Sequence, residues 1–244
     1  MSVVVTGAGT GIGRAIALHF ANAGHTVLGV GRRLEPLQSL QKEGNSANIH
    51  VVSADVSCKE GRQKIVGALP DPGTVKYLIH NAGVLTPVKP LMDVTEEEFR
   101  QHMQINLEAP LFLTQALMDK FEATDARVLH ISSGAAHKPY EGWGMYCTSK
   151  AALHMVYQML DTELKGKGNS NIRVGSLRPG VVDTPMQEVV RSSDRKVFPN
   201  IDRFVQLKES NGLIQPQDVA KFTYSLLCEK SAEEFASKEW DIRD

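Results

Sequence analysis

The chain has 244 residues and a formal net charge of −1; 42% of its residues are hydrophobic and 23% are charged. These values are typical of a globular protein, and the length predicts one domain that spans residues 1–244. Because the chain is nearly neutral, we expect it to bind neither nucleic acid nor an anionic membrane.

The cysteines, the histidines and the apolar runs exclude further classes of protein. The three cysteines are odd in number and form no CxxC pair, which favours a reducing cytoplasm over a disulfide framework. The eight histidines show neither HxxxH nor HxxH spacing, so we predict no metal site. The start, MSVVVTGAG, has an apolar run too short for a signal peptide, and no stretch approaches the ~20 apolar residues of a membrane span. We therefore expect a cytoplasmic protein.

Short apolar runs alternate with helical patterns along the chain. Most runs are continuous rather than alternating, which is typical of strands buried on both faces of a parallel sheet. The pattern predicts an α/β fold: a single doubly wound, Rossmann-type parallel sheet with helices on both faces. The predicted strands are residues 2–6, 26–30, 49–54, 77–83, 127–132 and 171–177, and the clearest helices are 13–24, 95–103 and 145–168.

Two segments carry more specific signals. Thr95 precedes the second of these helices with Glu98 three positions later, which predicts a capping box. The polar segment at about 183–216 contains three prolines, and we expect it to cover a ligand.

The motif TGAGTGIG lies between the first predicted strand and the first predicted helix. Gly7, Gly11 and Gly13, with Thr10 and Ile12 among them, would allow a tight turn and a close approach of the backbone to a ligand. A diphosphate can then bind the free N–H groups at the helix N-terminus. A glycine pattern alone is weak evidence, but the strand–turn–helix context favours dinucleotide binding over a merely structural turn.

The end of the second strand indicates which dinucleotide is bound. An NAD site has an acidic residue there for the ribose 2′-hydroxyl. Here the strand ends in Arg32 and Arg33, and no carboxylate occurs before Glu35. Guanidinium groups suit a 2′-phosphate, so the sequence predicts NADP(H), although two solvated arginines are the plainer interpretation.

Motifs spread over the whole chain resemble those of the short-chain dehydrogenase/reductase family. They are the glycine turn, NAG, a serine pair, YxxxK and RPG, in that order. The resemblance implies that Ser133, Tyr146 and Lys150 are catalytic and that Asn106 positions a water for proton relay. His80 and His130 stand where asparagine is common, and neither change removes a catalytic group.

The resemblance also implies cofactor contacts. Tyr146 and Lys150 would contact the cofactor, with Lys150 bonding the nicotinamide ribose. The other implied contacts are Asp55 and Val56 near the adenine, Asn81, Ala82 and Gly83 beside the adenosine ribose, and Pro179, Gly180, Val182 and Thr184 at the nicotinamide end.

Carbonyl reduction needs a hydride, a proton and a group that polarises the oxygen. Tyr146 could supply the proton, and Ser133 could donate a hydrogen bond to the substrate oxygen. Lys150 lies one helical turn from Tyr146, so its ammonium is expected to lower the pKa of the phenol. Each residue alone has an ordinary structural explanation, but their combination favours catalysis.

The segments KPYEGWGMYCTSKAAL and RPGVVDTPMQEVVR resemble the sepiapterin reductase and benzil reductase branch. The shared features are Gly142 and Trp143 before Tyr146 and Cys147, and the residues VDT and MQ after the PG pair. This resemblance implies an NADPH-dependent carbonyl reductase for a vicinal dicarbonyl or a pterin-like side chain. The implied substrate contacts are Ser133, Tyr140, Trp143, Met186, Phe204 and Asp241.

Two alternatives stay open at this stage. The core motifs also fit a dehydrogenase or reductase for another alcohol, a sugar or a 3-oxoacyl substrate. A non-catalytic NADP-binding regulator is the other, although such proteins are expected to lack the tyrosine or the lysine.

The family resemblance implies a homodimer or homotetramer, with the apolar faces of 99–118 and 145–164 as candidate interfaces.

Overall fold

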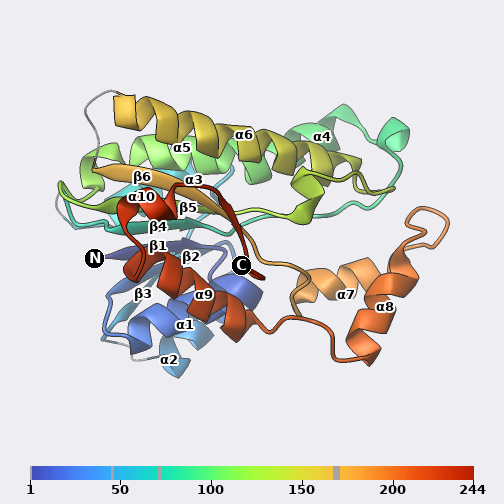
Figure 1. The fold of residues 1–244 in the computed structure, drawn as a ribbon, viewed down its shortest axis with the longest axis horizontal. Coiled ribbons are helices and arrows are strands. Elements are labelled where there is room, and N and C mark those ends of the chain that lie inside the picture. The colour runs from blue at the N-terminus through green and yellow to red at the C-terminus, as the bar shows by residue number, and fades with distance from the viewer. Residues whose placement is uncertain (1, 45–46, 71–72, 167–170) are drawn as a thin grey trace.

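The computed structural model describes residues 2–44, 47–70, 73–166 and 171–244. In this part of the chain seven strands form one sheet in which every neighbouring pair is parallel (Figure 1). The order is β3-β2-β1-β4-β5-β6-β7, so the first strand lies near the centre. The bounds are Val3–Thr6 (β1), Val27–Gly31 (β2), Ile49–Ser53 (β3), Tyr77–His80 (β4), Ala126–Ile131 (β5), Ile172–Arg178 (β6) and Glu239–Asp241 (β7).

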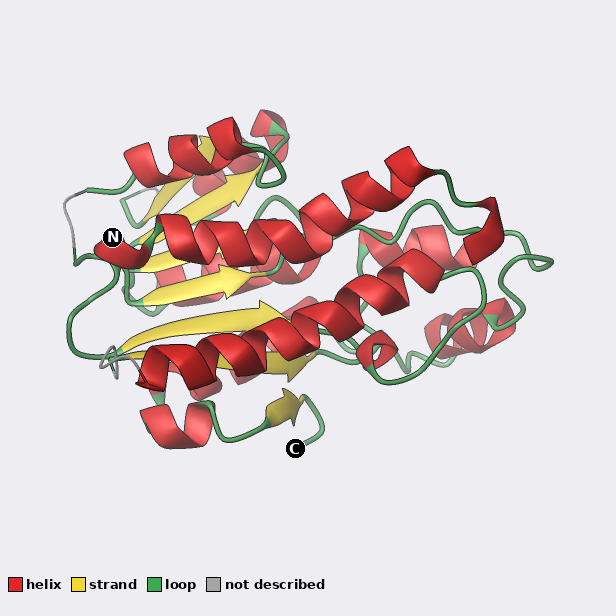
Figure 2. Cartoon of the chain, turned by 90° about the horizontal axis from the view of Figure 1, so that it is seen from above, coloured by secondary structure: helices red, strands yellow, loops and turns green. Residues whose placement is uncertain are grey.

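Helices cover both faces of the sheet, and α7 and α8 lie beyond the ends toward which the strands point (Figures 1 and 2). The first face carries α1 (Gly11–Asn22), α2 (Leu34–Glu43) and α9 (Pro216–Cys228). The opposite face carries α3 (Lys59–Gly67), α5 (Ala109–Ala116) and α6 (Gly144–Gly166). The remaining α-helices are α4 (Glu96–Met103), α7 (Pro185–Arg191), α8 (Ile201–Glu209) and α10 (Ala232–Phe235), and single 3₁₀ turns occupy Leu91–Asp93, Met118–Lys120 and Gly134–Ala136.

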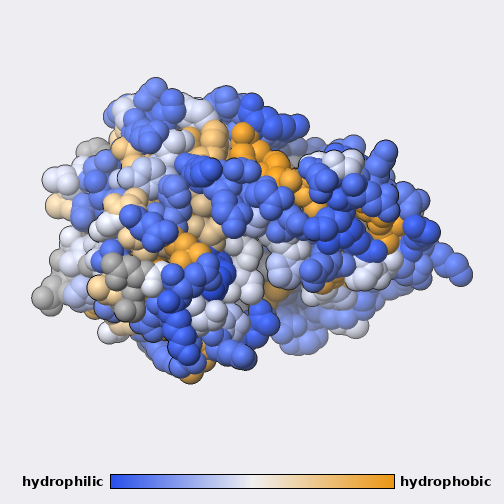
Figure 3. All heavy atoms as spheres, turned by 90° about the horizontal axis from the view of Figure 1, so that it is seen from below, coloured by the Kyte–Doolittle hydropathy of each residue, from blue (hydrophilic) through white to orange (hydrophobic). Residues whose placement is uncertain are grey.

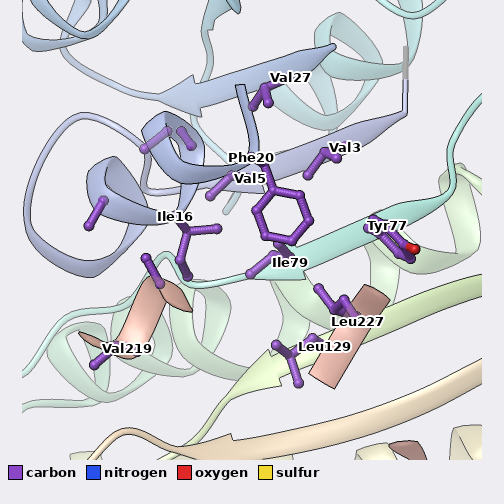
Figure 4. Packing of buried hydrophobic residues seen from close by; sticks show 14 of the residues in the cluster. Val3, Val5, Ile16, Phe20, Val27, Tyr77, Ile79, Leu129, Val219 and Leu227 are labelled. Carbon is purple, nitrogen blue, oxygen red and sulfur yellow. The ribbon is translucent and has the colours of Figure 1, made fainter. Parts of the chain in front are cut away.

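Phe20 of α1 anchors the first face of the sheet. Its ring is fully buried among side chains of β1, β4 and α9, and the close-up shows it between Val3, Ile79 and Leu227 (Figure 4). It meets the Tyr77 ring edge-on, with 6.0 Å between ring centres. Removing such a ring from a packed core costs about 3–5 kcal/mol, so this contact fixes α1 and the turn before it.

Strand residues alternate between two apolar clusters. Val3 and Val5 face the cluster under α1, whereas Val4, with Leu78 of β4, faces the cluster under α5 and α6. Successive side chains of a strand point to opposite faces, so a sheet covered on both faces needs apolar residues at every position. This explains the continuous apolar runs and confirms the predicted fold class.

Several boundaries differ from those predicted. The seventh strand was missed because Glu239–Asp241 is short and mixes charge with one aromatic residue. Residues 81–83 leave β4 for a loop, and α6 begins one residue earlier than expected, with 167–168 outside the described residues. The capping box at Thr95 is confirmed, since its hydroxyl accepts from the Glu98 N–H and the Glu98 carboxylate accepts from the Thr95 N–H.

The described helices include none with the length and apolar character of a membrane span. On the face seen from below, hydrophobic residues gather in a strip that runs from the middle of the molecule toward the end that carries α7 and α8 (Figure 3). This strip leads to the same end of the molecule as the carboxyl ends of the strands.

Candidate active site

A cavity of about 750 Å³ lies at the carboxyl ends of the strands. The loops after β1, β4, β5 and β6 line it, together with residues of α6, α7 and α8. In open parallel sheets ligands bind outside these strand ends. Most of the residues singled out from the sequence meet here; those that line the cavity are Gly7, Thr10, Gly11, Ile12, Asn81, Ala82, Gly83, Ser133, Tyr140, Trp143, Tyr146, Lys150, Pro179, Gly180, Val182, Thr184, Met186, Phe204 and Asp241.

The glycine turn and the NAG segment are joined by hydrogen bonds. Asn81 Nδ2 donates to the carbonyl of Thr6 at 2.9 Å, and the Ala82 N–H donates to the Thr6 hydroxyl at 3.1 Å. Gly7 has φ of +67°, which a side chain would strain. Gly13 does not line the cavity; a Cβ there would lie 2.4 Å from both Asn81 Nδ2 and the Gly7 carbonyl. The third glycine therefore serves this close packing.

The predicted contacts to the 2′-phosphate and the adenine lie outside the cavity, on neighbouring strand ends. Arg32 and Arg33 are exposed directly after β2, and Asp55 and Val56 follow β3, which pairs with β2. The pKa of Asp55 is lowered; burial opposes this, while hydrogen bonds from Ser57 and the charge of Arg32 favour it. A long ligand that leaves the cavity across β2 would meet a carboxylate and two guanidinium groups.

Ser133, Tyr146 and Lys150 come together from β5 and α6. Tyr146 shares a hydrogen bond with the Ser133 side chain. Lys150 Nζ donates to the carbonyl of Ile131 at 2.8 Å, and it lies 5.7 Å from the centre of the Tyr146 ring. All three side chains border the cavity, and both Tyr146 and Lys150 are buried.

The acid–base properties of this group differ from the expectation. Burial raises the pKa of Tyr146, against the hydrogen bond with Ser133, and the same burial lowers the pKa of Lys150 to about 8. Lys150 was expected to lower the pKa of the phenol. In this structure desolvation is the largest cause of the shift, because the phenol is buried away from water, and the ammonium donates its hydrogen bond to a backbone carbonyl.

Asn106 lies on a π-helical stretch, Gln104–Glu108, between α4 and α5. Its side-chain Nδ2 donates to the Val84 carbonyl at 2.8 Å, and its Oδ1 accepts from the Val84 N–H at 2.9 Å. The same amide nitrogen lies 2.7 Å from His102 Nε2 and 3.1 Å from the Ser149 hydroxyl. Asn106 does not line the cavity. His102 was not predicted as a site residue. Its position one helical turn before Asn106 was the sequence signal that could have indicated this contact.

The end of the cavity beside Tyr146 is aromatic, since the ring centres of Tyr146 and Trp143 lie 5.9 Å apart. Trp143 stacks on Phe198, with ring centres 4.9 Å apart and planes inclined by 13°, and Phe204 and Tyr140 flank it. Met186 also lines the cavity here. Aromatic surfaces of this kind bind planar apolar groups.

Two buried polar atoms at this end have no hydrogen-bond partner among the described residues. They are the indole Nε1 of Trp143 and the amide Oε1 of Gln187, and both residues line the cavity. A buried donor without a partner carries a desolvation cost, which a bound ligand can relieve. Gln187 was not predicted as a contact, although it lies in the segment VVDTPMQ that carries part of the branch resemblance.

Asp241 lines the cavity but is held by two arginines. Arg243 binds both carboxylate oxygens at 2.6 Å, and Arg178 lies at 3.3 Å. Hydrogen bonds from Arg243 are the main cause that lowers the pKa of Asp241 to about 2, against a smaller effect of burial. Both arginines also line the cavity and were not predicted as contacts, although Arg178 ends β6 and opens the RPG motif.

A parallel sheet with a glycine turn and a serine–tyrosine–lysine group at its carboxyl edge defines a nicotinamide-dependent oxidoreductase that acts on alcohols and carbonyls. Comparison with known proteins makes this more specific. The chain belongs to the short chain dehydrogenase family, whose model matches residues 1–195. Members of this family bind nicotinamide cofactors.

The chain is similar to members of the expected branch. It is 36% identical over 244 residues to a benzil reductase ((S)-benzoin forming) of Bacillus cereus, a match that covers 97% of this chain and 96% of the relative. It is 34% identical over 242 residues to sepiapterin reductase of Bos taurus, with coverage of 92% and 88%. The solved structure of the KRED1-Pglu enzyme superposes with a TM-score of 0.85 at 31% identity, and covers 98% of this chain and 100% of its own.

Proposed function

We propose that this chain is an NADPH-dependent carbonyl reductase whose substrates are vicinal dicarbonyl compounds with aromatic substituents. The cavity supports this because a polar serine–tyrosine pair lies beside an aromatic wall that contains an unpartnered indole N–H. One carbonyl oxygen would meet Ser133 and Tyr146, and the second would accept a hydrogen bond from Trp143. The unpartnered indole N–H of Trp143 is the observation on which the proposal of a dicarbonyl substrate rests.

The cofactor proposal is NADP(H). The turn at Gly7 and Gly11 lines the cavity and is the predicted phosphate site. Arg32 and Arg33 are exposed at the end of β2, where neither makes an ion pair with another described residue, so both are available to a 2′-phosphate. Bound NADPH would supply the hydride. Residues 183–216, which include α7 and α8, are proposed to cover the substrate.

The chain's own residues would handle the proton and the oxygen charge. Tyr146, whose raised pKa keeps it protonated at neutral pH, would donate its proton to the carbonyl oxygen as charge develops there. Ser133 would donate a second hydrogen bond to the same oxygen. The ammonium of Lys150 would stabilise the phenolate that remains, because it lies next to the ring in a site removed from water.

A pterin-like side chain is the second candidate, and the relatives include sepiapterin reductase. Anchoring an amino-substituted ring would need a free carboxylate in the cavity. Asp241 has the right position, but Arg243 and Arg178 already neutralise it. The charge around Asp241 therefore favours the dicarbonyl over the pterin.

The proposed setting is the cytoplasm, and the proposed assembly is a homodimer or homotetramer. Large apolar side chains on the expected interface helices remain exposed: Phe112 is 38% exposed, Met155 56% and Met159 48%. Such residues support an interface between copies of the chain, as expected for the faces of 99–118 and 145–164.

The substrate proposal is tested by following NADPH oxidation with matched ketones. The panel contains a diaryl 1,2-diketone, the same molecule with a methylene group in place of one carbonyl, a pterin ketone and a 3-oxoacyl thioester. We expect the diketone to exceed its methylene analogue by about tenfold in kcat/KM, which one hydrogen bond of ~1.4 kcal/mol supplies. A preference for the pterin or the thioester contradicts the substrate class, and no NADPH oxidation with any ketone contradicts the enzyme itself.

A further inference from the structure

Three potential metal ligands from distant parts of the chain meet beside the sheet edge. His137 follows the turn after β5, His154 lies on α6, and Glu239 begins β7. One ligand atom from each lies within 4.8 Å of the other two. The three segments are separated by long stretches of sequence, so no motif spacing could have indicated this cluster.

The geometry is close to that of a three-ligand zinc site. His137 Nε2 lies 2.5 Å from Glu239 Oε2, and His154 Nδ1 lies 3.2 Å from Glu239 Oε1. Zinc bonds of 2.0–2.2 Å in a tetrahedral arrangement place neighbouring ligand atoms ~3.3 Å apart. The two imidazoles meet edge to face with centres 4.6 Å apart, and each has a nitrogen near one oxygen of the carboxylate. Small side-chain rotations would bring all three atoms to bonding distance.

The surroundings include a group that orients the carboxylate and one that competes for it. The Ser176 hydroxyl donates to Glu239 Oε1 at 3.0 Å, as outer groups of metal sites do. Arg178 lies 3.3 Å from Oε2 and would share the carboxylate with the ion. The Glu239 side chain is only 7% exposed, whereas His137 is 40% exposed, which leaves an entry path and room for water as the fourth ligand.

We propose that His137, His154 and Glu239 bind one divalent zinc ion. Two imidazoles and one carboxylate suit zinc, whereas magnesium and calcium prefer oxygen ligands alone. The ion would connect the loop after Ser133, the helix of Tyr146 and Lys150, and the strand that ends in Asp241. This site is separate from the cavity, since none of its three ligands lines it. It would act as a structural clamp behind the catalytic group.

The test is a calorimetric titration of the tag-free, EDTA-treated and dialysed protein with ZnCl₂ and separately with MgCl₂. We expect one Zn²⁺ per chain, no Mg²⁺ binding and a higher melting temperature with Zn²⁺. His137→Gln and His154→Gln should each weaken Zn²⁺ binding by at least about tenfold. His50→Gln, which changes an exposed histidine on β3, is the matched control and should bind like the wild type.

Three results overturn the proposal. One is the absence of saturable Zn²⁺ binding by the wild type, which makes the cluster an ion-pair network only. The second is unchanged Zn²⁺ affinity in His137→Gln, whose exposed side chain can be replaced with little effect on packing. Circular dichroism and melting without metal show whether each variant is folded, and the third result, binding lost only in Cys58→Ser, assigns the ion to that exposed cysteine instead.

Discussion

The Lys150 ammonium lies 5.7 Å from the centre of the Tyr146 ring while it donates a hydrogen bond to the backbone of the strand behind it. The lysine therefore contacts the ring face and is fixed in place by the sheet. An ammonium in this position favours the deprotonated tyrosine, whereas burial of the phenol acts in the opposite direction and raises its pKa.

Replacing Tyr146 by phenylalanine should remove the proton donor while keeping the ring. We expect Tyr146→Phe to lower kcat by about 10²–10⁴-fold, the usual contribution of a general acid. NADPH binding, measured by fluorescence titration, should stay within about threefold of the wild type. Tyr157→Phe removes a hydroxyl from the same helix outside the cavity and is the matched control. Undiminished turnover in Tyr146→Phe would contradict the mechanism.

Replacing Arg32 by aspartate should change the cofactor preference. A carboxylate repels a 2′-phosphate and can accept from a 2′-hydroxyl. We expect Arg32→Asp to lower the ratio of kcat/KM for NADPH to that for NADH by at least about tenfold, as lost charge-assisted hydrogen bonds would. Lys42→Asp makes the same charge change on α2 and should leave the ratio unchanged. An unaltered ratio in Arg32→Asp would show that this residue does not read the phosphate.

Trp143 should distinguish dicarbonyl from monocarbonyl substrates. Trp143→Phe keeps an aromatic ring but removes the buried indole N–H. We expect kcat/KM to fall by about tenfold for the diaryl 1,2-diketone and to change by less than about threefold for its methylene analogue. Trp240→Phe is the control, since that indole donates to the Phe235 carbonyl outside the cavity. Equal losses for both substrates would assign Trp143 a packing role only.

Two buried histidines should make the fold sensitive to acid. Burial lowers the pKa of His130 to about 3 and that of His80 well below its ordinary value. Between about pH 6.5 and pH 3 the unfolded chain binds protons there that the folded chain does not, so stability falls as pH falls. We expect the loss in free energy of unfolding from pH 6.5 to pH 5 to be about 1.5 kcal/mol smaller in His130→Asn.

Denaturant titrations at the two pH values measure this difference. His50→Gln is again the control, because it removes an exposed histidine and leaves the buried His130 in place. If His130→Asn loses as much stability between the two pH values as the wild type, then His130 is not held neutral in the folded state.

The exposed methionines on α6 should report on assembly. We expect the double variant Met155→Glu/Met159→Glu to reduce the molar mass in solution, because two charges on one helical face oppose its burial against a second copy. Light scattering after gel filtration measures the mass. Met92→Glu changes a methionine that is 93% exposed and lies outside both candidate faces, so it should not alter assembly. A monomeric wild type, or an unchanged mass of the double variant, would contradict this interface.

Much of the fold could be predicted because periodicity and glycine punctuation are local signals. Six strands and the main helices follow from runs of apolar residues in a sheet covered on both faces. The last strand could not be predicted, since Glu239–Asp241 is held by its pairing with β6 and not by its own composition. Three residues are too few to show a sequence pattern that indicates a parallel partner strand far away in the chain.

The candidate site also contains some residues that local sequence predicts and others that only tertiary contacts bring together. The spacing of Tyr146 and Lys150 is local to one helix, and the resemblance added Ser133 at the end of another strand. The approach of Arg178 to Asp241 and the unpartnered amide oxygen of Gln187 depend on tertiary contacts, as does the cluster at His137. Even the sign of the pKa shift of Tyr146 required the structure, because burial decides it and sequence spacing does not.

The central position of the first strand has a consequence for how the chain reaches its fold. Val3 is in register with Val27 on one side and with Tyr77 on the other, so β1 cannot complete its pairing until β4 has been synthesised. Until then an apolar strand has unpaired edges that can associate with other chains. Folding should therefore be favoured by a low protein concentration or by a chaperone. Recovery of active protein after dilution from denaturant should decline as protein concentration rises.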